Sequence, residues 1–125
     1  MKEVNIYIRG ICKNFGEGSE LKEGKYIALI EYKGHYKKCV GKEVNTTSNR
    51  MFLVALIEGI KALRESCIIN FYTPTSLGFG KPNKSPNKDL LNEIFELVEA
   101  KGHKLNENIS KRYQNYLSDE LMKLD

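Results

Sequence analysis

The sequence contains no tryptophan, only three prolines and only two histidines. Its cysteines, Cys12, Cys39 and Cys67, are odd in number and form no CxxC motif. This pattern favours free thiols in a reducing compartment, and therefore a cytoplasmic location, over a disulfide framework or a zinc site. Because histidine is so scarce, a cysteine–histidine metal cluster is not expected either.

Long apolar runs are also absent. No run approaches the ~18 residues that a membrane-spanning helix needs, so no membrane association is expected. The start, MKEVNIYIRG, has neither a long apolar region nor a small-residue cleavage site, so no signal peptide is expected. The 125 residues, 41% hydrophobic and 29% charged, are typical of one globular domain over residues 1–125.

Acidic residues are few in the first part of the chain. Residues 1–50 hold ten Lys or Arg and six Asp or Glu, whereas residues 51–125 hold ten of each. The net charge of +4 therefore comes entirely from the first fifty residues. A local basic surface attracts phosphate groups, although a well-solvated surface explains the same counts equally well.

Apolar patterns predict the secondary structure. Strands are predicted at residues 3–9, 25–32, 36–44, 67–73 and 103–109. Helices are predicted at residues 48–65, 87–102 and 110–125, the first of them apolar on most sides. Residues 10–24, with four glycines, and residues 74–88, with all three prolines, are predicted loops. This order predicts an α/β fold with helices packed on a mixed sheet.

Several segments of the chain resemble the type 1 ribonuclease H family. They are VNIYIRGICKN (4–14), TTSNRMFLVALIEGIKALRESC (46–67), INFYTPTS (69–76), DLLNEIFELVEAKGHKL (89–105) and NYLSDEL (115–121). The second segment is the most specific, and together they cover most of the chain. The resemblance implies a ribonuclease H-like mixed five-stranded sheet, an antiparallel meander followed by parallel strands, with helices on both faces.

The resemblance also implies a reaction, but this sequence lacks most of the metal-binding carboxylates that the reaction needs. Family members hydrolyse the RNA strand of an RNA–DNA hybrid, with four carboxylates holding two divalent ions that stabilise the attacking and leaving oxygens. At three of those positions this chain has Arg9, Phe52 and Pro74. Only the last carboxylate is retained, as Asp119 in NYLSDEL.

The charge of Arg9 opposes metal binding. Two unit charges ~4 Å apart interact by about 4 kcal/mol at an effective dielectric constant near 20, and a divalent ion feels roughly twice that. We therefore expect no two-metal magnesium site, no cofactor and no hybrid cleavage by the family mechanism. We further hypothesise that Arg9 pairs with the remaining carboxylate, Asp119.

The resemblance also indicates residues that contact nucleic acid. Thr47, Ser48 and Asn49 form the polar lead-in to the first helix, where Thr47 or Ser48 is also a candidate N-cap. The other positions at which the family meets the hybrid are Gly10, Cys12, Lys13 and Ser76.

Other side chains have simpler interpretations. Phe52 is expected to fill the space of the lost metal site, with base stacking as the alternative. Lys81, Lys84 and Lys88 make the 74–88 loop basic, which a solvated loop explains. Most of the seven tyrosines and five phenylalanines are expected to lie in the core.

Three functions follow from these observations. The first is a non-cleaving, pseudoenzyme member of the family that binds an RNA–DNA hybrid or another duplex. The second is a degenerate ribonuclease H-like module that contacts a protein partner or a second copy of itself. The third, least favoured, is an active RNA–DNA hybrid ribonuclease with carboxylates at positions other than those assigned.

Overall fold

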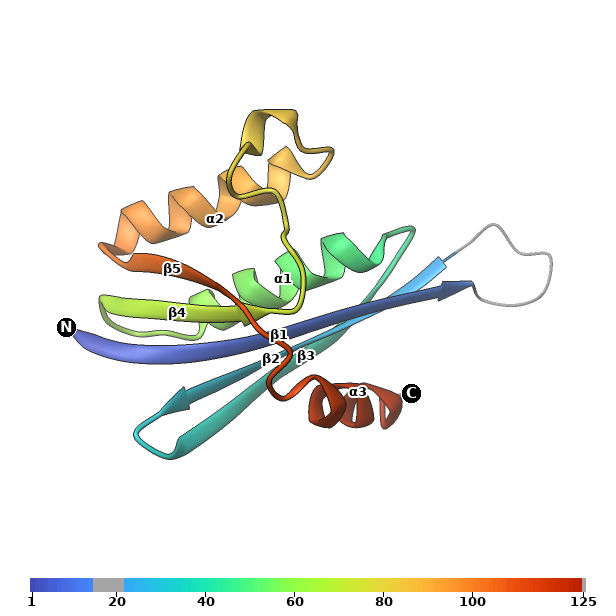
Figure 1. Ribbon diagram of the computed structural model, residues 1–125, viewed down its shortest axis with the longest axis horizontal. Coiled ribbons are helices and arrows are strands. Elements are labelled where there is room, and N and C mark those ends of the chain that lie inside the picture. Colours follow the sequence, from blue (N-terminus) through green and yellow to red (C-terminus); the bar gives the residue numbers. More distant parts are fainter. Residues whose placement is uncertain (15–21, 125) are drawn as a thin grey trace.

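A computed structural model describes residues 1–14 and 22–124, which form a five-stranded sheet with helices on both faces (Figure 1). The strands lie in the order β3-β2-β1-β4-β5. They are β1 (Lys2–Asn14), β2 (Lys22–Tyr32), β3 (His35–Val44), β4 (Cys67–Thr73) and β5 (Lys104–Ile109). The helices are α1 (Ser48–Lys61), the 3₁₀ turn η1 (Pro82–Lys84), α2 (Lys88–Lys101) and α3 (Gln114–Met122). This confirms the predicted mixed five-stranded sheet.

The sheet is antiparallel on one side and parallel on the other. β1 pairs with β2, and β2 with β3, in antiparallel register. β1 pairs with β4, and β4 with β5, in parallel register. The β2–β3 hairpin turns through Lys33 and Gly34, whose φ angles of 49° and 82° match the tight turn that suits right-twisted strands.

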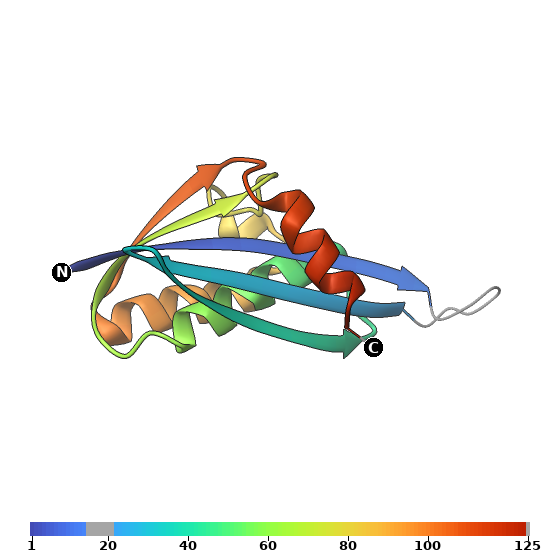
Figure 2. The same cartoon turned by 90° about the horizontal axis from the view of Figure 1, so that it is seen from below.

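Alternate side chains of the central strand β1 face different helices. Ile6 and Ile8 pack in the larger core cluster, which includes side chains of α1 and α2. Tyr7 packs in the smaller cluster with Leu117 and Leu121 of α3. Figure 2 shows α3 on the opposite side of the sheet from α1 and α2. The prediction of helices on both faces is therefore confirmed.

The glycine-rich segment differs from its prediction. β1 continues to Asn14 and β2 begins at Lys22, so residues 10–24 are not one loop. A Cβ atom on Gly10 or Gly24 would lie within 2.7 Å of Met51 atoms in α1. These glycines therefore permit close helix–strand packing rather than a turn. The remainder of the predicted loop, residues 15–21, lies outside the described residues.

The helices are shorter than predicted. Helix α1 ends at Lys61 rather than at residue 65, and α3 spans Gln114–Met122 rather than residues 110–125. Tyr113, immediately before α3, has a φ of 66°, which places it in the left-handed region and starts the helix late. Among the helices of the described residues, none has the length and apolar character needed to cross a membrane.

Candidate nucleic-acid interface

Three of the four positions matched to the family's metal ligands are neighbours in space. Tyr7 of β1 pairs with Tyr72 of β4, so Arg9 and Pro74, each two residues further along, lie at the same end of adjacent parallel strands. The backbone nitrogen of Phe52 would lie 2.4 Å from a Cβ built on Gly10. The fold therefore brings β1, β4 and the start of α1 together where the resemblance places the metal site.

Arg9 has a different partner from the one predicted. Its Nη1 donates a hydrogen bond to Oε1 of Gln114, 2.9 Å away, and Gln114 Nε2 in turn donates to the carbonyl of Ile8. Within the described residues Arg9 forms no ion pair with Asp119 or with any other carboxylate, so the predicted Arg9–Asp119 pair is wrong.

Helix geometry explains the failed pairing. Gln114, Leu117 and Leu121 form the buried side of α3, spaced by three and four residues. At about 100° per residue, Asp119 lies roughly 140° around the helix from Gln114. Asp119 is consequently exposed to solvent, and the neutral Gln114 faces the sheet in its place.

Phe52 and Pro74 occupy their positions for structural reasons. Phe52 is only 6% exposed and belongs to the larger core cluster. The ring is therefore packed in the core and offers no exposed face to a base. Pro74 directly follows Thr73, the last residue of β4, where a missing backbone donor ends the ladder.

These residues do not fit a pair of divalent ions. The set consists of a guanidinium, a buried phenyl ring, a proline and one exposed carboxylate, whereas Mg²⁺ requires several oxygen ligands and compensating negative charge. In residues 1–14 and 22–124 no group of three or more His, Cys, Asp or Glu side chains has a metal-binding arrangement.

The polar lead-in to α1 has the predicted capping role. Thr47 Oγ1 accepts a hydrogen bond of 3.2 Å from the backbone nitrogen of Arg50, which makes Thr47 rather than Ser48 the N-cap. Thr47, Ser48 and Asn49 are exposed and line a hollow of about 390 Å³ with Pro86 and Asn87.

A second hollow adjoins the first through shared residues. It has a volume of about 290 Å³ and includes Asn49, the predicted contact Ser76, Lys81, Lys84 and Asn87. We call the two together the helix-start hollow, because the N-termini of α1 and α2 both open onto it. Ser85 and Asn87, which the sequence analysis missed, line it from the segment between η1 and α2, and Asn87 Oδ1 accepts a hydrogen bond from Arg50 Nη1 of α1.

The helix-start hollow is electropositive. The first turn of α1 contains no acidic residue, so no carboxylate of that turn offsets the partial positive charge of its free amides. Asp89, in the first turn of α2, is bound by both terminal nitrogens of Arg50 at 3.0 and 2.8 Å. This bidentate hydrogen bond is the main reason why the pKa of Asp89 is lowered to about 2. Lys81 and Lys84 add positive charge at the rim.

The remaining predicted contacts do not line the helix-start hollow. Gly10 is buried against Met51 and Phe52. Cys12 Sγ lies 3.3 Å from the carbonyl oxygen of Thr46, to which it donates. Lys13 is exposed near the end of β1.

Sequence comparison assigns the chain to a family, although no family model matches it. A protein named ribonuclease H from Campylobacter jejuni (strain 81-176) is 33% identical, over 96% of this chain and 86% of that protein. The chain belongs to the ribonuclease H family. A ribonuclease H from Caldicellulosiruptor saccharolyticus is 48% identical over 77 residues, which are 61% of this chain and 49% of that protein.

Solved structures agree on the fold of this ribonuclease H family member. LC11-RNase H1, isolated from compost, superimposes with a TM-score of 0.71 at 19% identity, over 97% of this chain and 93% of that one. The same protein in complex with an RNA/DNA hybrid gives a TM-score of 0.63 at 17% identity, over 95% of this chain and 93% of that one.

Proposed function

We propose that this protein binds the phosphate backbone of an RNA–DNA hybrid or related duplex without cleaving it by the two-metal mechanism. The proposal rests mainly on the position of Arg9 and on its hydrogen-bond partner. Its guanidinium stands where the family places a metal-binding carboxylate, and its nearest bonded partner is the neutral amide of Gln114. A cation without a carboxylate partner attracts phosphate directly.

The helix-start hollow supports the same proposal. Free amides at the start of α1, the hydroxyl of Ser48 and the side chain of Asn49 are suited to phosphate oxygens. Lys81 and Lys84 supply screened, longer-range attraction. The complex of LC11-RNase H1 with an RNA/DNA hybrid supports a hybrid as the ligand to test first.

The expected loss of cleavage rests on the residues at the four positions matched to metal ligands. Asp119 is the only carboxylate at the four positions, and the other three hold Arg9, Phe52 and Pro74. One exposed carboxylate cannot offset the repulsion between a guanidinium and two divalent ions. The free cysteines Cys12, Cys39 and Cys67 support a reducing, cytoplasmic setting.

The binding test compares two arginines. Fluorescence anisotropy of a labelled hybrid at about 50 and about 200 mM salt gives the affinity and its salt dependence. Arg9→Gln should weaken binding and reduce the slope of log K against log salt by about 1. Arg64→Gln, at an exposed arginine beyond the far end of α1, is the matched control and should bind like the wild type.

A cleavage assay in Mg²⁺ and Mn²⁺ accompanies the binding test. The expected result is an intact hybrid in both ions. If the hybrid is cut and Asp119→Asn abolishes the cutting, the protein is an active ribonuclease and the proposal is wrong. If Arg9→Gln binds like the wild type, phosphate binding at Arg9 is wrong.

A protein-interaction module is the second candidate, favoured by exposed apolar side chains on β3. Val40 and Val44 are both exposed on this edge strand. Lys37, Lys38 and Lys42 on the same strand oppose edge-to-edge pairing of copies. Light scattering distinguishes the candidates, because a dimer that persists at high salt, without hybrid binding at low salt, would favour the interaction module.

A further inference from the structure

Tyrosine side chains gather on the α3 side of the sheet, although the sequence analysis assigned most aromatic residues to the core. They come from four separate elements: Tyr7 of β1, Tyr36 of β3, Tyr72 of β4, and Tyr113 and Tyr116 at the start of α3. Nothing in their sequence spacing indicates this, because only the strand register and the position of α3 bring them together.

The buried ring of Tyr7 and its neighbours hold the exposed rings in place. Tyr7 is 3% exposed and stacks on Tyr72 with ring centroids 4.6 Å apart. It also contacts Tyr113 edge to face at 4.6 Å, and Tyr113 lies 6.3 Å from Tyr116 in the same geometry. The outermost rings are freely accessible, since Tyr36 is 56% and Tyr116 41% exposed.

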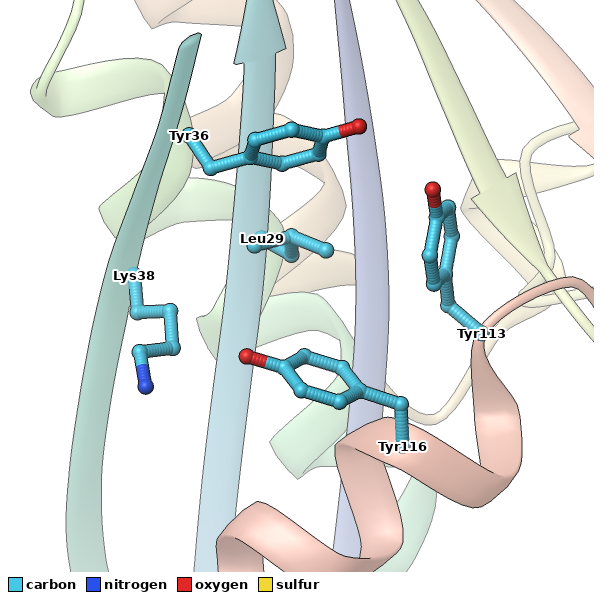
Figure 3. Close-up of a pocket in the computed structure, with 5 residues that line it drawn as sticks. All are labelled: Leu29, Tyr36, Lys38, Tyr113 and Tyr116. Carbon is cyan, nitrogen blue, oxygen red and sulfur yellow. The ribbon is translucent and has the colours of Figure 1, made fainter. Parts of the chain in front are cut away.

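These outer rings surround an apolar groove. The groove has a volume of about 370 Å³ and is lined by Leu29, Tyr36, Lys38, Tyr113 and Tyr116. Figure 3 shows Leu29 between the rings, with the hydroxyl of Tyr36 directed towards that of Tyr113 and the hydroxyl of Tyr116 towards the Lys38 side. A flat ring placed above Leu29 would meet aromatic faces or edges on both sides, from β3 and from α3.

The backbone supports this arrangement at some cost. Tyr113 has a φ of 66°, a left-handed conformation that side-chain-bearing residues rarely adopt. It occupies the N-cap position of α3 without making a side-chain capping bond. Strained positions of this kind cluster at binding sites, because the surrounding structure must hold them in place.

Cationic side chains lie beside the rings of the groove. The Arg112 guanidinium lies over the Tyr113 ring at 5.2 Å. Lys38 and Lys123 share the single carboxylate of Glu120. The other nearby carboxylate, Glu31, accepts hydrogen bonds from the Asn5 amide and the Gly34 nitrogen. Arg112 and Lys38 therefore place positive charge beside the exposed rings, which favours an anionic ligand over a neutral one.

We propose that this tyrosine groove binds an unpaired base of single-stranded nucleic acid, stacked against Tyr36 and Tyr116, with Lys38 and Arg112 facing its phosphates. Aromatic rings beside cations are the combination that single-strand binders use, and every base has a face that can stack. A neutral peptide would use the rings but not the charged rim. The groove shares no lining residue with the helix-start hollow, and Arg9, which is hydrogen-bonded to Gln114 of α3, does not line it either. This site therefore goes beyond the proposed function.

The test uses a labelled oligothymidylate of about ten nucleotides and the full chain at about 50 mM salt. Tyr36→Leu and Tyr116→Leu keep an apolar side chain and remove a ring. Each should therefore raise the Kd at least about fivefold. Phe95→Leu removes an exposed ring from α2, on the other side of the sheet, and should leave the Kd unchanged.

Intrinsic fluorescence provides a second readout of stacking. The chain has seven tyrosines and no tryptophan, so quenching on titration reports on tyrosine directly. Wild type should be quenched more strongly than Tyr36→Leu or Tyr116→Leu.

Three results would overturn the groove proposal: no binding of the oligonucleotide at low salt, equal Kd values for wild type and both ring variants, or tighter binding of a proline-rich peptide than of the oligonucleotide. Failure of Arg9→Gln to affect hybrid binding would leave the groove proposal standing, because Arg9 does not line the groove.

Discussion

His103 shows how one buried side chain links pH to stability. It is 6% exposed, and its Nδ1 accepts a hydrogen bond of 2.9 Å from the backbone nitrogen of Cys67. Its Nε2 is buried and has no hydrogen-bond partner among the described residues. Burial, with a smaller contribution from Lys101, lowers the pKa of His103 below its ordinary value of 6.5. Protonation would also break the bond from Cys67, so the folded state favours the neutral ring.

The first prediction concerns this residue. Because the folded-state pKa lies below the unfolded one, the stabilisation is complete above about pH 6.5 and is lost as the pH falls. The free energy of unfolding, measured in urea, should therefore decrease between about pH 7.5 and about pH 5.5. His103→Gln should remove most of this decrease, whereas His35→Gln, at an exposed histidine, should retain it. An unchanged slope in His103→Gln would contradict the assignment.

At the scale of elements, the contact between β1 and α1 determines the shape of the candidate interface. Gly10 allows α1 to approach so closely that an added Cβ would lie 2.4 Å from Phe52 N and 2.5 Å from Met51 Cβ. Both are parts of a helix that the larger core cluster holds rigidly. A side chain at residue 10 must therefore push α1 away from the strand and distort the turn at Thr47.

The second prediction follows from that contact. Gly10→Ala should lower the free energy of unfolding by about 1–3 kcal/mol, because overpacking displaces the helix. Gly80→Ala is the matched control, since a Cβ there meets no atom within 4 Å and should change stability by less than about 0.5 kcal/mol. Urea unfolding of the two variants beside the wild type measures both. Equal stability of the two variants would contradict the close packing.

At the scale of the whole molecule, the sequence was informative where a pattern is local. The run at residues 67–73 predicted β4 without error, because an apolar stretch ends at a proline. The sequence misled at residues 10–24, where glycine indicated a loop but serves packing between distant elements. Arg9 was assigned the wrong partner, because the side of α3 that faces the sheet depends on where the helix begins. The tyrosine groove could not be predicted, since it depends on strand order and register.

Divalent ions test whether the whole fold retains any metal site. A ligand that binds only the folded state raises its stability, by about 2.7 kcal/mol at one hundred times the Kd. If the site at Arg9, Phe52 and Pro74 holds no ion, about 10 mM MgCl₂ should raise the thermal midpoint no more than NaCl of equal ionic strength.

The matched variant combines Arg9→Asp, Phe52→Glu and Pro74→Asp, which places three carboxylates at the neighbouring positions, while Asp119 stays on the exposed side of α3. Without metal its thermal midpoint should be lower than that of the wild type, because a buried carboxylate replaces the ring of Phe52 and like charges repel. Mg²⁺ should raise the variant's midpoint by several degrees, about the shift that a few kcal/mol produces in a domain of this size. A rise specific to Mg²⁺ in the wild type would show that the folded protein still binds the ion and would contradict the loss of the metal site.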